Sequence, residues 1–492
     1  MFKPTFESLY QYESPEWFRD AKFGIWSHWG PQSVPMFGDW YARYMYEQGT
    51  AQYNYHLRHY GHPSKFGYKD ICKLWKAENF DPEGLMELYY KAGARYFVAL
   101  ATHHDNFFNY DSKVNRFNST QIGPMKDICR LWQTAAKKYN LPFGLTEHLG
   151  ASFSWWKTNK GSDNYGPYKG LPYDGNDPDY ADFYYNNYEH AQDRIDTIGP
   201  WYTLNENFHQ YWVDAIKEMI DEFQPDLLYS DGVLPFGSHH NSWEHEQGYR
   251  DVVSPGDPSY RPGLEVLAYH YNKSIEKNGS NQAVYLQKDK RPEIYNVGIL
   301  DIEKSQMPRV TEKPWHTDTC IGNWFYDAKQ TYKKTDQILE MLVDIVSKNG
   351  NMLLNILQRP DGTIDEEAKY LLDELAKWFV VCGEGIYGTR PWKVSGEGNT
   401  LVKIVPYVEE KTSWNSSDYR FTSKGNHVYS FIMCPPANGV CVLKSFNDET
   451  VKSVQILGGG KLEFTQDSGV LAVKLPQELP ATYFNCLKTE LE

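Results

Sequence analysis

Two acidic residues stand directly after short apolar runs, where a carboxylate could act on a bound substrate. Asp231 follows the run in "FQPDLLYSDG" (223–232), and Glu303 ends "VGILDIE" (297–303), with Asp301 two residues earlier on the same face of the expected strand. Two carboxylates about 5 Å apart support a retaining glycoside displacement, in which one attacks and the other protonates the leaving oxygen. Each also has an ordinary structural interpretation, because Asp231 could cap a turn and Glu303 could be a surface acid.

Four histidines, His28, His103, His104 and His148, stand at the ends of the first three apolar runs. A cluster of imidazoles can hydrogen-bond several sugar hydroxyls, or it can bind zinc. Because adjacent side chains of a strand point to opposite faces, we expect His103 and His104 to diverge, so that at most three imidazoles converge. We therefore predict hydroxyl ligands rather than a metal site, and no cofactor.

Aromatic residues make up 16% of the chain, with 38 tyrosines and 16 tryptophans. The faces of indole and phenol rings can pack against the C–H faces of a sugar. Most tryptophans of any fold are simply packed in the core. The candidate platforms are Trp26, Trp29, Trp40, Trp315 and Trp324.

The elements that must position these residues alternate along the first three quarters of the chain. Apolar runs that predict buried strands lie at 22–29, 95–105, 142–150, 226–232, 283–288, 297–303 and 351–358. Helical periods lie at 81–93, 125–140, 206–223, 264–279 and 335–350, the last with an expected Thr335 cap and a terminal Gly350. Glycines in "KAGA", "KNGS" and "KNGN" are expected to end helices in the left-handed conformation.

This alternation predicts an α/β fold with a (β/α)8-like TIM barrel, in which functional residues gather at the carboxyl ends of the strands. A doubly wound open sheet is the alternative, but no glycine-rich phosphate loop follows any strand. After a helix at 365–383 the pattern changes to strand-like runs separated by turns, beginning with "LVKIVPYV" (401–408). We expect a catalytic barrel over 1–385 and a C-terminal antiparallel β-sandwich over 386–492.

Composition excludes several classes of partner. The net charge of −14 opposes nucleic-acid binding, and no run of about 18 apolar residues predicts membrane insertion. The N-terminal residues contain no recognisable signal peptide, and the seven cysteines show no CxxC spacing. Oligomeric state is not predicted by any of these features.

Several motifs in order resemble the α-L-fucosidases of glycoside hydrolase family 29. They are "WFRDAKFGIWSHWG", "GDWYARYMY", "ATHHDNF", "DLLYSDG", "PWHTDTCIGNWFYD", "LVDIVSKNGNMLLNI" with "PDGTID", and "GEGIYGTRPW", and they run from residue 17 to 392. The resemblance implies a (β/α)8-like barrel, a C-terminal β-sandwich and exo-acting hydrolysis of terminal α-L-fucosides with retention. The implied partner is a fucosylated oligosaccharide or glycoconjugate.

The resemblance also implies roles for individual residues. Asp231 of "YSDG" looks like the catalytic nucleophile, and Glu303 is the acid/base candidate, with Glu147 and Glu312 as reserves. Asp39 stands where many members have glutamate. The implied sugar contacts are His28, Asp39, Trp40, His103, His104, His148, Trp315 and Trp324, with Trp324 shaping the pocket around the fucose methyl.

Alternatives stay open at this point. The chain could be a carbohydrate-binding protein on an inactive hydrolase scaffold, a glycosidase for a related sugar such as a galactoside, or a metal-dependent hydrolase. Linkage preference is expected to lie in the rim loops 157–205 and 237–262. The family's usual setting implies a secreted or periplasmic location, against which stand the missing signal and the unpaired thiols.

Overall fold

Eight parallel strands form the barrel of the computed structural model, which describes residues 1–187, 201–237 and 255–492. The strands are β1 (Phe23–Ser27), β2 (Phe97–Thr102), β3 (Phe143–Glu147), β4 (Leu227–Ser230), β5 (Val284–Gln287), β6 (Ile299–Leu300), β7 (Trp315–Cys320) and β8 (Gly350–Asn355). Their spatial order is β6-β5-β4-β3-β2-β1-β8-β7, and a parallel bridge between Asp301 and His316 brings β6 beside β7. The predicted barrel is thereby confirmed.

The barrel strands are buried along their whole length, which explains their continuous apolar character. One glycine shows how tightly they pack. A Cβ on Gly24 of β1 would lie 2.4 Å from the ring of Tyr96, so only glycine fits there.

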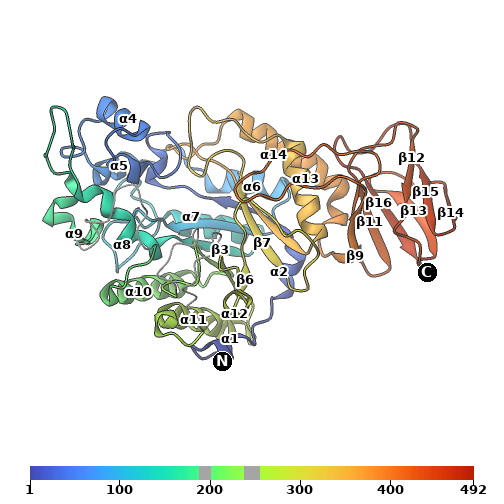
Figure 1. The fold of residues 1–492 in the computed structure, drawn as a ribbon, viewed down its shortest axis with the longest axis horizontal. Coiled ribbons are helices and arrows are strands. Elements are labelled where there is room, and N and C mark those ends of the chain that lie inside the picture. The colour runs from blue at the N-terminus through green and yellow to red at the C-terminus, as the bar shows by residue number, and fades with distance from the viewer. Residues whose placement is uncertain (188–200, 238–254) are drawn as a thin grey trace.

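Helices connect most of the strands and cover the barrel (Figure 1). The longer helices are α4 (Ala51–His59), α5 (Tyr68–Leu74), α6 (Pro82–Lys91), α7 (Ile128–Lys138), α10 (Glu206–Phe223), α11 (Arg261–Asn278), α13 (Thr335–Ser347) and α14 (Glu366–Cys382). The short ones are α1 (Phe6–Leu9), α2 (Glu16–Ala21), α3 (Tyr41–Tyr44), α8 (Ser152–Trp155), α9 (Ala181–Tyr184) and α12 (Pro292–Tyr295). None of the helices in the described ranges is both long and apolar enough to cross a membrane.

The connection between β6 and β7 departs from the alternating pattern. Residues 301–314 contain no helix, and β7 itself was not predicted, because "WHTDTC" carries polar residues that become buried. This loop holds Glu303, and the backbone amides on either side of it, of Ile302 and Lys304, each donate to a β7 carbonyl at 2.9 Å. The missing helix therefore leaves Glu303 on a short connection fixed to the barrel wall.

The expected helix ends are correct in two cases and wrong in the third. Gly93 and Gly279 adopt positive φ angles of 102° and 79° after α6 and α11. At the end of α13 the left-handed residue is Asn349 (φ 76°), whereas Gly350 begins β8. Glycine is required there for a different reason, because a Cβ would lie 2.6 Å from the Trp315 ring. The expected Thr335 cap is also wrong, since Lys334 is the N-cap residue and makes no side-chain cap.

The C-terminal strands form two antiparallel sheets at one end of the molecule (Figure 1). The larger sheet has the order β13-β16-β11-β10-β9 and the smaller one β12-β15-β14. Their bounds are β9 (Arg390–Glu397), β10 (Tyr419–Lys424), β11 (His427–Ile432), β12 (Val440–Leu443), β13 (Val451–Ile456), β14 (Phe464–Asp467), β15 (Val470–Lys474) and β16 (Cys486–Leu491). The sandwich prediction is confirmed, but the strand expected at 401–408 is absent and that segment forms a loop.

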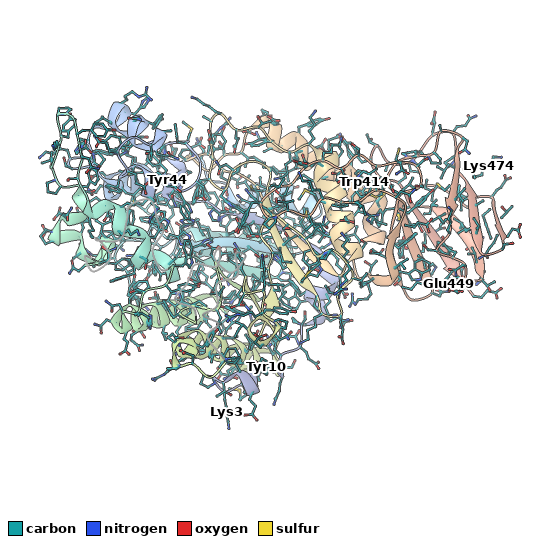
Figure 2. The ribbon with its side chains drawn as sticks, viewed as in Figure 1. Lys3, Tyr10, Tyr44, Trp414, Glu449 and Lys474 are labelled. Atoms are coloured by element: carbon teal, nitrogen blue, oxygen red, sulfur yellow. The ribbon has the colours of Figure 1, made fainter. Side chains whose placement is uncertain are left out.

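Helix α13 joins the barrel to the sandwich. The indole nitrogen of Trp414 donates to Glu340 of α13 at 2.9 Å, and the guanidinium of Arg420 from β10 lies over the Trp414 ring at 4.7 Å. Arg420 also pairs with Asp344 of α13. Trp414 accordingly lies at the junction between the two domains (Figure 2).

Candidate active site

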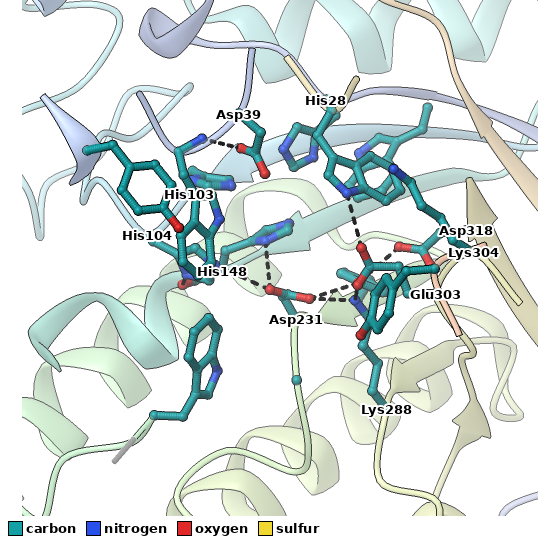
Figure 3. Close-up of a pocket in the computed structure, with 18 residues that line it drawn as sticks. His28, Asp39, His103, His104, His148, Asp231, Lys288, Glu303, Lys304 and Asp318 are labelled. Carbon is teal, nitrogen blue, oxygen red and sulfur yellow. Dashed lines mark hydrogen bonds and ion pairs between the residues drawn. The ribbon is translucent and has the colours of Figure 1, made fainter. Parts of the chain in front are cut away.

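A cavity of about 620 Å³ lies at the carboxyl ends of the barrel strands, where the sequence predicts the functional residues to gather. Figure 3 shows the side chains that line it. They are Trp26, His28, Asp39, Trp40, Tyr44, His103, His104, His148, Trp201, Tyr229, Asp231, Gly232, Lys288, Glu303, Lys304, Asp318, Trp324 and Tyr407.

One lysine holds the two candidate catalytic carboxylates together. The Nζ of Lys288, just after β5, lies 2.7 Å from Asp231 Oδ1 and 2.5 Å from Glu303 Oε2. The three side chains are 13 to 16% exposed, so water screens this arrangement only weakly. Asp231 and Glu303 therefore lie close together in the cavity, although they come from the segments that follow β4 and β6.

The shared ammonium limits how far apart the two carboxylates can be. Because both contacts are to one nitrogen, the two oxygens that make them lie at most about 5 Å apart. Retaining glycosidases have carboxyl groups about 5–5.5 Å apart, whereas inverting enzymes need about 6.5–9.5 Å to seat a water. The geometry is that of direct attack by one carboxylate.

The surroundings of Asp231 keep it ionised. Burial alone would raise the pKa of Asp231, but the Lys288 ammonium, together with hydrogen bonds from His104 and His148, outweighs it and holds that pKa well below its usual range. The Tyr229 hydroxyl adds a hydrogen bond to Asp231 Oδ1 at 3.1 Å. An ionised carboxylate at the cavity wall is what a nucleophile requires.

Glu303 is positioned by a second donor. The indole nitrogen of Trp324 donates to Glu303 Oε1 at 3.0 Å, so each carboxylate oxygen has a defined partner. Trp324 is itself positioned by the Lys304 ammonium, which lies 4.7 Å from its ring centroid. The side chain of Glu303 is thus oriented toward Asp231 rather than toward solvent.

Behind the catalytic pair lies a buried acidic cluster. Asp301 accepts from His316 of β7 at 2.5 Å and does not line the cavity, so its expected place beside Glu303 is wrong. Burial raises the pKa of Asp301 to about 7 and that of Asp318 well above its usual value. The Tyr229 hydroxyl lies 3.2 Å from Asp318 and links this cluster to Asp231.

All four predicted histidines line one wall of the cavity. The expectation that His103 and His104 diverge is wrong, because β2 ends at Thr102 and both residues lie in the following turn, where strand alternation no longer holds. Their ring centroids are 4.6 Å apart, and the His148 centroid lies 4.8 Å from that of His103. The turn, not the strand, aims both rings inward.

The histidines present a mixed hydrogen-bonding surface. Burial lowers the pKa of His148 to about 4 and those of His28 and His103 well below the usual value, so these rings are neutral at ordinary pH. Gln32 donates to Nδ1 of His103 at 2.8 Å, which leaves the His103 proton on Nε2. Nδ1 of His148 lies 3.3 Å from Asp231 Oδ2, whereas among the described residues no group hydrogen-bonds Nε2 of His148 or either ring nitrogen of His28. Buried nitrogens of this kind indicate a polar ligand such as a set of hydroxyls.

Asp39 and Trp40 close the cavity beside the histidines. Trp40 has a positive φ of 56°, and its amide donates to the carboxylate of Asp39 at 2.8 Å. Burial raises the pKa of Asp39 to about 7. The indole of Trp40 stacks at 6.0 Å on Trp201, a residue that sequence reasoning missed.

Four further predicted residues lie elsewhere. Trp29, one of the candidate platforms, is buried and donates to the Arg359 carbonyl at 3.0 Å. Trp315 begins β7 at the opposite end of the strand, is 1% exposed and donates to the Lys348 carbonyl, so it is a core residue. Glu147 is buried and accepts from Leu149 and Trp212 instead of lining the cavity. Glu312 is exposed on the β6–β7 connection and does not line the cavity either.

A metal ion is the competing ligand for the histidine wall. His103, His104 and His148 place ligand nitrogens within 4.8 Å of one another, as do His28 and His103 with Asp39 in a second combination. The Nδ1 atoms of His103 and His104 are already engaged, by Gln32 and by the His148 carbonyl. Each ring would therefore coordinate through its other nitrogen, Nε2, but Nε2 of His104 lies 3.3 Å from Asp231 Oδ2 and is engaged as well.

Sequence reasoning missed Lys288, Tyr229 and Tyr407 as well. Lys288 ends the apolar run 283–288, so the rule that pointed to Asp231 also pointed to Lys288. Tyr229 is the strand residue two positions before Asp231 and shares its face. Tyr407 comes from the segment expected to be a strand of the sandwich, and no sequence signal placed it here.

Family comparisons agree with the two-domain structure. The family model described as "Alpha-L-fucosidase" matches residues 1–384, and "Alpha-L-fucosidase C-terminal domain" matches residues 395–489. The tissue alpha-L-fucosidase of Rattus norvegicus is 28% identical over 98% of this chain and 90% of its own length. The tissue alpha-L-fucosidase of Homo sapiens is 27% identical over 98% of this chain and 89% of its own length.

Solved structures show the same fold. The Thermotoga maritima alpha-fucosidase in complex with fucose superposes with a TM-score of 0.71 at 24% identity, covering 99% of this chain and 100% of that one. An alpha-L-fucosidase from Bacteroides thetaiotaomicron gives a TM-score of 0.64 at 15% identity, with 97% and 94% covered. Because both identities are below 25%, these comparisons show only that the fold is shared.

Proposed function

The chain belongs to the α-L-fucosidase family, and we propose that it is an exo-acting retaining α-L-fucosidase that releases terminal α-L-fucosyl residues from glycans. The observation that carries the proposal is the pair of carboxylates of Asp231 and Glu303 on one ammonium, at a separation suited to double displacement. No cofactor takes part in this chemistry.

In the first step Asp231 attacks the anomeric carbon of the bound fucoside. The bond from that carbon to the leaving oxygen breaks as the bond to the Asp231 carboxylate forms, which gives a covalent fucosyl-enzyme. Glu303 gives its proton to the leaving oxygen, so that the aglycone departs as a neutral alcohol. The Lys288 ammonium lies between the two acids and favours the ionised form of Asp231 before attack.

In the second step water replaces the aglycone. Glu303, now a carboxylate, removes a proton from the water, whose oxygen attacks the anomeric carbon and displaces Asp231. Two inversions at one carbon give net retention. The product is α-L-fucose, and both acids return to their starting protonation states.

The histidine wall supports recognition of a single terminal sugar. Both ring nitrogens of neutral His28, and Nε2 of neutral His148, lack partners among the described residues and can bind hydroxyls. A site whose buried polar groups require partners rejects a sugar that lacks one hydroxyl, because the unpaired group then costs about 1–3 kcal/mol. A pocket that binds the hydroxyls of one terminal sugar releases sugars from chain ends, and this supports exo-action. The residues that contact the rest of the substrate set the linkage preference.

The experiment that tests the proposal follows the anomeric proton by NMR during hydrolysis of an aryl α-L-fucoside. Retention predicts α-L-fucose as the first product, with the β-anomer appearing only by mutarotation. First release of β-L-fucose would contradict the double displacement. Absence of any release, with fucose still bound, would favour an inactive carbohydrate-binding protein, and faster release from an α-galactoside would favour the related sugar.

Cellular location is a separate proposal. We propose a secreted or periplasmic setting, which the family resemblance supports. Assay of fucosidase activity in fractionated cells and medium tests it. Activity confined to the cytoplasmic fraction would contradict it. The rim loops 157–205 and 237–262, in which linkage preference is expected to lie, include residues 188–200 and 238–254, which lie outside the described residues.

A further inference from the structure

A loop of the C-terminal part of the chain reaches the catalytic cavity. Tyr407, from the loop of residues 401–408, is among the side chains that line the cavity. Val408 N donates to the Val405 carbonyl at 3.1 Å, so residues 405–408 form a tight turn with Pro406 in its second position. Tyr407 occupies the third position with a φ of +62°.

This turn contains an unfavourable residue. A turn with proline second and a positive φ third normally has glycine or asparagine in the third position, because a larger side chain is strained there. Backbone strain of this kind persists only where the surroundings enforce it, and it collects at ligand-binding sites. The chain thus keeps a phenol ring where glycine would suit the backbone better.

The loop is attached firmly to the barrel. The carboxylate of Glu409 accepts from Lys333 Nζ and from the Thr319 hydroxyl, both at 2.9 Å, and Gln337 donates to the Glu409 carbonyl at 2.8 Å. Thr319 belongs to β7 and Gln337 to α13. The turn is therefore held over the rim by elements of the catalytic barrel itself.

Tyr407 lies on the side of the cavity that holds the general acid. Val405 and Val408, at the two ends of the turn, line a smaller cavity together with Lys304 and Ser305, the residues that follow Glu303. Burial, and then the nearby charge of Glu303, raise the pKa of Tyr407, while the Lys288 ammonium opposes that rise. The residue as a whole is still 41% exposed, so it is not fully covered by its neighbours. The acid must contact the glycosidic oxygen, so the group attached to that oxygen leaves on this side.

We propose that Tyr407 forms the binding platform for the leaving group, and that this group is the sugar ring to which the fucose is attached. This inference rests on the proposed fucosidase activity. The C–H face of a pyranose packs on the phenol ring, while the ring's rigidity keeps the entropic cost of the contact low. The C-terminal part of the chain thereby contributes directly to substrate selection.

The test compares two substrates in Tyr407→Ala. α-L-Fucosyl fluoride has no sugar leaving group, whereas a fucosyl disaccharide does. We expect kcat/KM for the disaccharide to fall about 5- to 10-fold, which lies within the range of about 2- to 13-fold for loss of one ring contact, and kcat/KM for the fluoride to stay within about twofold. Tyr407→Phe should retain disaccharide cleavage, because stacking needs the ring and not the hydroxyl.

Two controls separate a binding role from a structural one. Tyr407→Gly relieves the strained φ, so its melting temperature should not fall although disaccharide cleavage does. Tyr370→Ala removes a tyrosine of α14 that is 62% exposed and does not line the cavity, and it should affect neither substrate. Equal losses on fluoride and disaccharide, or no loss on the disaccharide, would overturn the inference. A wild-type enzyme that leaves fucosyl fluoride intact would instead overturn the proposed function on which the inference rests.

Discussion

Replacing Lys288 with methionine should shift the pH dependence of catalysis. The ammonium lies 2.7 Å from Asp231 and 2.5 Å from Glu303, and its side chain is 13% exposed. A close opposite charge lowers a carboxylate pKa by about 1–3 units, equivalent to about 1.4–4 kcal/mol. Methionine keeps much of the volume but removes the charge, so the pKa of Asp231 rises.

The sign of the effect follows from which form of Asp231 is active. The folded-state pKa of Asp231 is depressed, so its ionised form persists as pH falls. In Lys288→Met the carboxylate becomes protonated at higher pH, and activity is lost from the acidic side first. We expect the acidic limb of kcat/KM to move upward by about 1–3 pH units, with kcat/KM at the optimum reduced about 10²- to 10³-fold.

The assay is the pH profile of kcat/KM on an aryl α-L-fucoside. Lys304→Met is a matched control, because Lys304 lines the same cavity but contacts the Trp324 ring instead of Asp231, so its acidic limb should stay in place. Lys288→Arg keeps the charge and should shift the limb less than methionine does. An unmoved acidic limb in Lys288→Met would refute the assignment of Lys288 as the group that keeps Asp231 ionised.

Three further predictions concern the same chemistry. Asp231→Ala should abolish turnover of an aryl α-L-fucoside, and added azide should restore release as the β-fucosyl azide seen by NMR; wild-type activity in this variant would remove Asp231 from the mechanism. Glu303→Gln should slow substrates with poor leaving groups by about 10²- to 10⁴-fold, and activated aryl fucosides far less, because only the former need protonation; equal losses would indicate a structural role. Activity should persist after dialysis against a chelator, since we assign the histidines to binding sugar hydroxyls. If activity were lost and added metal restored it, the imidazole cluster would be a metal site instead.

Local patterns account for much of the fold. Strands that are buried along their whole length need continuous apolar runs, and these are visible without any knowledge of neighbours, as at β1 to β5. The carboxyl ends of those runs directed attention to Asp231 and to the histidines, because a parallel barrel brings all such ends to one rim. The same reasoning applied to Lys288 would have found it.

Sequence patterns did not predict the structure where polar residues become buried, or where long-range contacts determine the conformation of a segment. Strand β7 was missed because His316 and Asp318 interrupt its apolar pattern, and only their partners Asp301 and Tyr229 make that burial tolerable. Trp315 was assigned to the site because a tryptophan looks the same in a core and in a pocket. The segment 401–408 has the composition of a strand, but Glu409 and its partners hold it over the barrel instead.

The order of residues by itself determined the fold class, the rim on which the candidate site lies and the acidic residues proposed to act there, since these depend on periodicity and on short-range patterning. Tertiary structure decided the distance between Asp231 and Glu303, the convergence of four imidazoles and the presence of Tyr407. These depend on side chains separated by tens to hundreds of positions, whose approach is set by packing and by shared charges such as that of Lys288. No local sequence pattern encodes the distance between two side chains that are far apart in the sequence.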